Sequence, residues 1–176
     1  MGIGLETIKS AIAEFKGVEG RLEEIKSSRL IRVFVDYAHT DNALENLLFT
    51  LRKFAPARII TVFGCGGERD KSKRPLMGRV AQDFSDYTIL TSDNPRRENP
   101  IEILNQIEAG MNNGEGNYEV EADRYQAIKK AIVRARDNDI VVIAGKGHET
   151  YQAIGGKKIP FDDRKITREL LLNVHG

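Results

Sequence analysis

The sequence has no tryptophan, and its 176 residues include one cysteine. A single cysteine, Cys65, excludes an internal disulfide and fits a reducing compartment. No apolar run approaches the length of a membrane-spanning helix, and the N-terminus lacks the order of charged, apolar and small residues that marks a signal peptide. We therefore expect a cytoplasmic protein without a membrane partner.

The chain also lacks a large excess of positive or negative charge, because its formal net charge is +1. Such a chain has no global basic field of the kind that accompanies nucleic-acid binding, so we expect no nucleic-acid partner. The phosphate-loop pattern Gly-x-x-x-x-Gly-Lys-Ser/Thr is absent, and no cluster of histidine and cysteine has the spacing of a zinc site. The sequence therefore predicts no metal site in this chain.

Short apolar segments alternate with segments of helical period from residue 29 onward. This alternation predicts an α/β fold: a Rossmann-like, mostly parallel sheet with helices on both faces. The most apolar strand is expected at the centre of the sheet and the least apolar, 118–121, at an edge. Strands are expected at 30–35, 58–63, 87–91, 118–121 and 139–144, and helices at 41–54, 74–84, 101–111, 124–136 and 162–174.

Local signals mark where some of these elements begin. The helix at 41–54 has three candidate caps, Thr40, Asp41 and Asn42, the last within a capping-box pattern that ends at Glu45. The sequence Ile154-Gly155-Gly156-Lys157 predicts the turn of a β-hairpin.

The two ends of the chain carry their own patterns. Residues 1–16 contain a short helical stripe, and the glycine-punctuated segment 17–23 is typical of a connector. Asp162 or Asp163 is expected to cap the last helix.

Polar segments follow four of the predicted strands, at residues 36–40, 64–74, 91–100 and 145–149. In a parallel sheet the carboxyl ends of the strands share one edge, where open α/β sheets bind their ligands. We therefore expect these four segments to converge on a single site.

The segment 91–100 has the most specific chemistry. Pro95 restricts the backbone, so Asp93, Asn94 and Arg96 can form a fixed array of acceptor, amide and guanidinium. Arginine pairs with carboxylates, and Glu149 from the last segment could accept from an ammonium, so the array suits a zwitterionic ligand. The alternative is a solvated turn with surface arginines.

The glycine-rich segment 64–74 combines backbone N–H groups with four basic side chains, which suits an anion such as a phosphate or a carboxylate. The four are Arg69, Lys71, Lys73 and Arg74. A flexible, solvated basic loop is the alternative. Asp36 could bind ribose hydroxyls, or it caps the turn that follows it. A packed, unreactive thiol is the preferred interpretation of Cys65.

The sequence of the last polar segment, Gly145-Lys146-Gly147-His148-Glu149, does not have the spacing of a phosphate loop. Gly145 permits close approach of the backbone to a ligand. No nucleophile lies near His148 in the sequence, so a local structural or solvent-facing histidine is expected there.

Taken in order, these motifs resemble the C-terminal region of the Mur ligases, the ATP-dependent amide-forming enzymes of peptidoglycan precursor synthesis. The resemblance covers nearly the whole chain. Within the family, Asp93 to Arg96 resembles the signature of members that add meso-2,6-diaminopimelate. The segments that carry the resemblance are 17–21, 35–40, 63–75, 93–96 and 144–149.

The resemblance implies two sets of site residues, and no catalytic residue in this chain. Arg96 would favour the extra carboxylate by which diaminopimelate differs from lysine, since a charge-assisted hydrogen bond contributes about 1.5–3 kcal/mol. The residues implied to hold meso-2,6-diaminopimelate are Arg69, Asp93, Asn94, Pro95, Arg96, Gly145 and Glu149, and those implied to contact ATP are Arg21, Asp36 and His39.

The family resemblance also implies a domain division. Residues 1–22 would be the end of a central ATPase domain and a hinge, and residues 23–176 the amino-acid-binding domain. ATP, Mg²⁺ and the UDP-N-acetylmuramoyl dipeptide would be bound largely by domains absent from this chain. In the implied mechanism, ATP phosphorylates the dipeptide carboxylate and the diaminopimelate amine then attacks it, so we expect this chain alone to be inactive. Asp41 departs from the family, which usually has proline there.

Two other functions remain open. The chain could be a stand-alone, non-catalytic α/β module that binds an amino acid or a nucleotide. It could instead be the corresponding domain of a folylpolyglutamate synthase-like ligase, whose amino acid is glutamate. A purely structural scaffold would leave the convergent polar segments unexplained.

Overall fold

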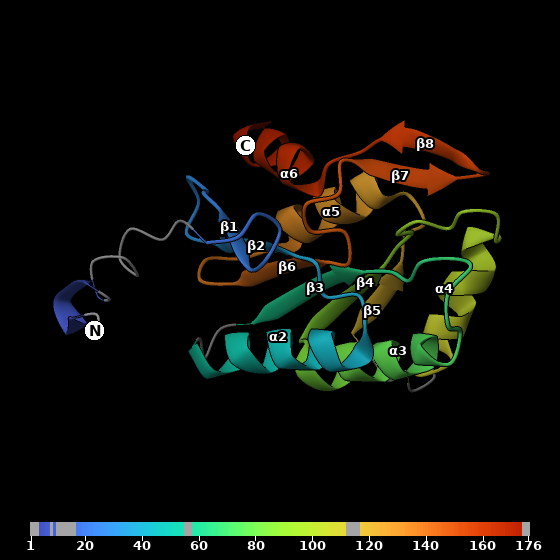
Figure 1. The fold of residues 1–176 in the computed structure, drawn as a ribbon, viewed down its shortest axis with the longest axis horizontal. Helices are drawn as coiled ribbons and strands as arrows, with labels where there is room; N and C mark the ends of the chain where they lie inside the picture. The colour runs from blue at the N-terminus through green and yellow to red at the C-terminus, as the bar shows by residue number, and fades with distance from the viewer. Residues whose placement is uncertain (1–3, 8, 10–16, 55–57, 112–116, 174–176) are drawn as a thin grey trace.

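The computed structural model describes residues 4–7, 9, 17–54, 58–111 and 117–173. Strands and helices alternate along most of this length (Figure 1). The strands are β1 (Glu23–Ile25), β2 (Arg32–Asp36), β3 (Ile59–Phe63), β4 (Tyr87–Leu90), β5 (Tyr118–Val120), β6 (Ile140–Ala144), β7 (Tyr151–Ile154) and β8 (Lys157–Pro160). The helices are α2 (Asp41–Phe54), α3 (Lys73–Phe84), α4 (Pro100–Glu108), α5 (Arg124–Arg134) and α6 (Asp163–Asn173).

Six strands form the main sheet in the order β1-β2-β6-β3-β4-β5. All neighbouring pairs are parallel except β1 with β2. The predicted mostly parallel sheet is therefore confirmed, with β6 inside it and β5 at an edge. The predicted hairpin turn is also confirmed, because it joins β7 to β8 in a separate two-stranded sheet.

Alternate residues of the strands pack on opposite faces of the sheet. Phe34 belongs to the core under α2, α3 and α4, whereas its neighbours Val33 and Val35 belong to the core under α5 and α6. Figure 1 shows these two helical layers on either side of the sheet. Both faces are thus covered, which explains why β3 and β6 are buried along their whole length.

The structure corrects some of the expected boundaries. The segment 17–23 was expected to be a connector, but Glu23 already begins β1, which pairs with β2 through tertiary contacts that the sequence does not encode locally. Thr40 caps α2, because its hydroxyl accepts from the Ala43 N–H at 3.2 Å, so the capping-box prediction at Asn42 is wrong. The helical stripe expected at 1–16 lies largely outside the described residues.

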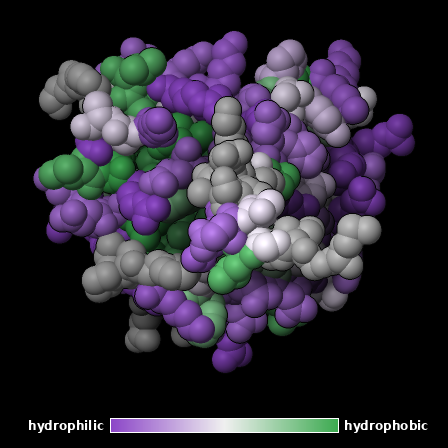
Figure 2. Space-filling view, turned by 60° about the vertical axis from the view of Figure 1, so that its left-hand side comes forward, coloured by the Kyte–Doolittle hydropathy of each residue, from purple (hydrophilic) through white to green (hydrophobic). Residues whose placement is uncertain are grey.

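The exposed surface is mainly polar. On the face shown in Figure 2, hydrophilic residues predominate and hydrophobic ones lie among them in small groups. In the part of the chain that the structure describes, no helix is long and apolar enough to cross a membrane.

Gly78 lies where α3 contacts α4, and a Cβ added there would come 2.2 Å from the Ile107 carbonyl oxygen. Replacing a helical glycine with alanine ordinarily stabilises a protein by about 0.5–1 kcal/mol. We expect Gly78→Ala instead to lower the free energy of unfolding by about 1–3 kcal/mol, because overpacking outweighs helix propensity. Urea denaturation measures the change, with exposed Arg79→Ala as the control. A Gly78→Ala protein more stable than wild type would contradict this close helix contact.

Candidate functional site

A polar pocket of about 290 Å³ lies at the carboxyl ends of β2, β3, β4 and β6. Each of the four polar segments contributes residues to its lining. The expectation that these segments lie together is therefore confirmed. Six of the seven residues expected to hold the amino acid line it, and His39 joins them. The lining comprises Tyr37, His39, Gly66, Arg69, Lys73, Asp93, Asn94, Arg96, Gly145, Glu149 and Tyr151.

The hairpin β7–β8 fixes the position of Arg96. The Arg96 N–H donates to the Ala153 carbonyl at 2.8 Å, and its carbonyl accepts from the Gly155 N–H at 2.6 Å. The residue adopts φ of +54°, and its guanidinium donates to the Gly67 carbonyl. Pro95, the remaining predicted residue, is buried beside it, and its carbonyl oxygen would lie 2.0 Å from a Cβ added at Gly67. Pro95 therefore shapes the loop from behind the pocket.

Asn94 and Glu149 are joined in one network by Lys146. The Asn94 amide nitrogen donates to Glu149 Oε2 at 2.8 Å, and Lys146 Nζ donates to the same oxygen at 3.0 Å. Burial alone would raise the pKa of Glu149, but the hydrogen bonds from Lys146 and Asn94 outweigh it and hold the pKa below its usual value. Glu149 is thus a carboxylate at neutral pH.

Asp93 lines the pocket but is buried, with 7% exposure. Its Oδ2 is buried and has no hydrogen-bond partner among the described residues. Burial raises the pKa of Asp93, and the charges of Arg124 and Lys146 offset only part of the rise. A Cβ added at Gly145, which has φ of +113°, would come 2.6 Å from Oδ2. The close approach and the positive φ both require glycine at 145.

The basic residues of the 64–74 segment differ in their roles. Arg69 is exposed at the pocket, and Lys73 Nζ donates to the His39 carbonyl at 2.8 Å. Arg74 was expected to attract an anion, but its side chain is fully buried and bonds to Glu98 at 2.9 Å and Gln106 at 2.7 Å. That prediction is wrong, because Arg74 joins the loop to α4.

Glu98 completes this link between the two loops. The Arg74 guanidinium and the Glu68 N–H donate to the Glu98 carboxylate and lower its pKa to about 2. The segment 64–74 is thus held to the segment 91–100 by charge, and it is not the freely flexible loop that was the alternative.

Of the three residues expected to contact ATP, His39 lines the pocket, whereas Arg21 and Asp36 are not part of its lining. Asp36 accepts from the Ala38 N–H at 2.7 Å and the Leu22 N–H at 2.6 Å, so the turn-cap interpretation is confirmed. Arg21 is exposed, with its guanidinium 4.7 Å from the Tyr37 ring centroid. The His39 ring is also exposed and lies edge-on to Tyr37, with centroids 4.7 Å apart.

The segment before β1 packs against the loop after β6. A Cβ added at Gly20 would come 2.1 Å from the His148 backbone nitrogen, and one at Gly147 would come 2.6 Å from the Gly20 carbonyl oxygen. His148 itself is exposed, as expected, and its ring lies 5.1 Å from that of Tyr37. Gly20 is therefore packed against the loop after β6, and the Leu22 N–H is bonded to Asp36 at the end of β2.

Cys65 is the packed thiol that the sequence predicts. Its sulfur lies 3.5 Å from the Met77 sulfur, and burial raises its pKa to about 12. A thiol with this pKa is protonated at neutral pH and is a poor nucleophile.

Sequence reasoning missed three residues that support the pocket. Lys146 is fully buried beside the pocket, and Arg124 forms a fully buried ion pair with Asp163 at 2.8 Å. Arg124 also donates to the Ala144 carbonyl at 2.9 Å, next to Gly145. The only sequence signal for Lys146 was its position between two glycines. No local pattern marked Arg124 or Asp163 as residues that support the pocket.

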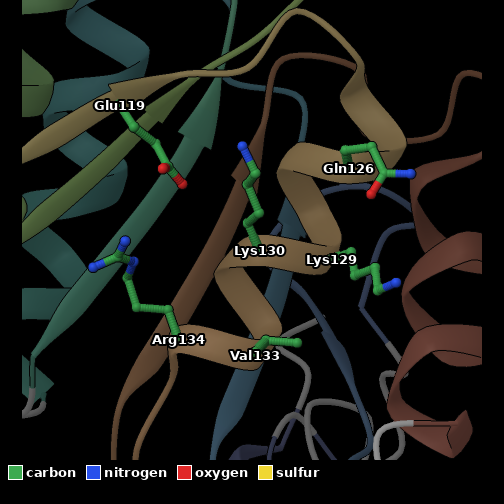
Figure 3. A pocket seen from close by; sticks show the side chains of 6 residues that line it. All are labelled: Glu119, Gln126, Lys129, Lys130, Val133 and Arg134. Atoms are coloured by element: carbon green, nitrogen blue, oxygen red, sulfur yellow. The ribbon is translucent and has the colours of Figure 1, made fainter.

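A second pocket, of about 510 Å³, lies between β5 and α5, away from these loops (Figure 3). Figure 3 shows Glu119 and Lys130 pointing toward each other across it. Lys130 pairs with Glu121 at 2.7 Å, and Arg134 lies over the Tyr87 ring at 3.9 Å. Lys130 and Arg134 thus each contact a partner outside the lining of this second pocket. Among the described residues no group of three or more His, Cys, Asp or Glu side chains is arranged to hold a metal ion.

The model of the family described as "Mur ligase, glutamate ligase domain" matches residues 20–147. The chain belongs to the Mur ligase family. A relative from Solibacter usitatus, named UDP-N-acetylmuramoyl-L-alanyl-D-glutamate--2,6-diaminopimelate ligase, is 49% identical over 97% of this chain and 34% of its own length. A solved structure of a ligase with the same name is 40% identical, with a TM-score of 0.85, over 99% of this chain and 36% of that one.

The chain spans about a third of the length of these Mur ligase relatives. Folylpolyglutamate synthase from Thermotoga maritima shares the fold, with a TM-score of 0.58 over 82% of this chain and 31% of its own, at 19% identity. That likeness is one of fold alone.

Proposed function

We propose that this chain is the amino-acid-binding domain of an ATP-dependent ligase that adds meso-2,6-diaminopimelate to UDP-N-acetylmuramoyl-L-Ala-D-Glu in peptidoglycan precursor synthesis. The observation that carries the proposal is that two arginines, Arg69 and Arg96, and a carboxylate, Glu149, line the same pocket. Relatives 49–50% identical over 97% of the chain have names that state this reaction.

The proposed role of the domain is to position the amino acid. The guanidinium of Arg96, supported by Arg69, binds a carboxylate, and Glu149 accepts from an ammonium. Holding both ends of the ligand presents its amine to the activated carboxyl group on another domain, and such orientation lowers the barrier to attack. The chain supplies binding groups only, so we expect no ligase turnover from it alone.

Nucleotide binding is the second part of the proposal. Residues 1–22 connect to a central ATPase domain, and ATP contacts Arg21, Asp36 and His39 on closure of the domains. Support comes from the half-buried Tyr37 ring, which contacts the Arg21 guanidinium and the exposed rings of His39 and His148, so that flat faces and a cation lie together. In this proposal the other domains hold Mg²⁺ together with the ATP phosphates. The dependence of the ligase on ATP is the basis for proposing that it is a cytoplasmic enzyme.

Calorimetry with four ligands tests the proposal. We expect the chain to bind meso-2,6-diaminopimelate weakly, and to bind L-lysine, L-glutamate and ATP more weakly still. Tight binding of ATP alone would favour a stand-alone nucleotide module, and preference for glutamate would favour a folylpolyglutamate synthase-like domain. Either result would sink the proposed function.

A further inference from the structure

Lys146 is a lysine with a fully buried side chain beside the pocket. Its ammonium donates to Asn94 Oδ1 at 3.2 Å, to Glu149 Oε2 at 3.0 Å and to the Tyr151 carbonyl at 2.5 Å. A lysine ammonium has three N–H donors, and all three are engaged. Lys146 therefore has no donor left for a ligand, and any effect on binding acts through its partners.

The first partner is the Asn94 amide. Its Oδ1 accepts from Lys146 and also from the Ala153 N–H at 2.9 Å. Turning the amide over would place its NH₂ group against two donors, so the observed orientation is fixed. In that orientation the amide nitrogen points to Glu149.

The second partner is Glu149. Its Oε2 accepts from both Lys146 and Asn94, whereas its Oε1 has no hydrogen-bond partner among the described residues. One oxygen is thus anchored and the other is available at the pocket.

We propose that Lys146 is a positioning residue of the amino-acid pocket, which orients the Asn94 amide and holds Glu149 as an anchored carboxylate for the ammonium of the ligand. The inference rests on the proposed function for the identity of the ligand. The geometry of Lys146, Asn94 and Glu149 carries it, since one cation ties the loop after β4, the loop after β6 and strand β7 together.

Other charges surround Glu149 and remain when Lys146 is replaced. Arg96 favours the ionised carboxylate. Asp93 and Glu149 repel each other when both are ionised. Arg124 lies near both carboxylates and is paired with Asp163. The remaining titratable groups that line the pocket are Tyr37, His39, Arg69, Lys73 and Tyr151.

The test uses Lys146→Met, with Lys129→Met on the exposed side of α5 as the matched control. Carboxyl ¹³C NMR titration reports the pKa of Glu149, which we expect to be below its usual value in wild type and in the control, and higher in Lys146→Met. Affinity for meso-2,6-diaminopimelate at neutral pH should fall about tenfold or more, as expected for loss of a charge-assisted hydrogen-bond network. It should fall further as the pH drops through the raised pKa, because a protonated Glu149 cannot accept from an ammonium.

An unchanged Glu149 titration in Lys146→Met would overturn the positioning role. If the variant does not fold, the pKa of Glu149 in the wild-type protein provides the test. A pKa at or above the usual value would refute the inference, and a pKa below it would support the inference. These titrations need no ligand. Failure of wild type to bind diaminopimelate would therefore count against the proposed function, separately from the effect of Lys146 on Glu149.

Discussion

Arg96→Met is expected to weaken meso-2,6-diaminopimelate binding by about 10- to 150-fold, the equivalent of one charge-assisted interaction of roughly 1.5–3 kcal/mol. L-lysine lacks the second carboxylate, so its affinity should change little and selectivity between the two amino acids should be lost. Methionine is preferred to alanine because it keeps much of the length of the side chain. It is preferred to glycine because the φ of this residue is +54°, where glycine would change the backbone preference as well as the side chain. Calorimetric titration of both ligands measures the effect.

Arg97→Met is the matched control for Arg96→Met. Arg97 is adjacent in sequence but exposed, and it does not line the pocket. Its replacement should leave both affinities within about twofold, as expected for a solvated charge. Equal losses for diaminopimelate and lysine in Arg96→Met would show that Arg96 does not select the second carboxylate.

Arg124→Met is expected to lower the free energy of unfolding by about 3–5 kcal/mol, because it leaves Asp163 as an unpaired buried charge. Both side chains have 0% exposure, and Arg124 Nε and Nη2 donate to the two Asp163 oxygens at 2.9 and 2.8 Å. The loss should also loosen the pocket, since Arg124 donates to the Ala144 carbonyl beside Gly145. Urea denaturation measures the change in stability.

The double variant Arg124→Met/Asp163→Leu separates charge burial from packing. Removing both charges should recover most of the lost stability, as replacement of buried ion pairs by apolar residues often does. As a control, Arg32→Met breaks the exposed pair with Glu24, in which the side chains are 52% and 46% exposed, and should cost about 1 kcal/mol or less. If Arg124→Met lowers the free energy of unfolding no more than Arg32→Met does, the importance of the buried pair is contradicted.

Periodicity and strand order explain what the sequence could predict. The apolar run 140–144 is long and uniform enough to mark β6 as an inner strand, and the turn at Gly155-Gly156 is a local signal. Convergence of Arg69, Arg96 and Glu149 followed from parallel strands alone, without knowledge of any contact.

The remaining features depend on contacts between distant segments. β1 is three residues long, and all three pair with β2 in an antiparallel register that no local pattern predicts. Arg74 and Lys73 are neighbours in sequence with the same charge, yet Arg74 is fully buried and paired with Glu98, whereas Lys73 reaches the pocket. Whether a charge is buried or solvated is settled by tertiary packing, so spacing alone could not separate these two residues.

A crystal structure of the chain with meso-2,6-diaminopimelate tests the central claim most directly. The account predicts the ligand in the pocket between the carboxyl ends of β2, β3, β4 and β6, with one carboxylate on Arg96 and an ammonium on Glu149. A ligand bound elsewhere, or one whose carboxylates both lie away from Arg96 and Arg69, would contradict it.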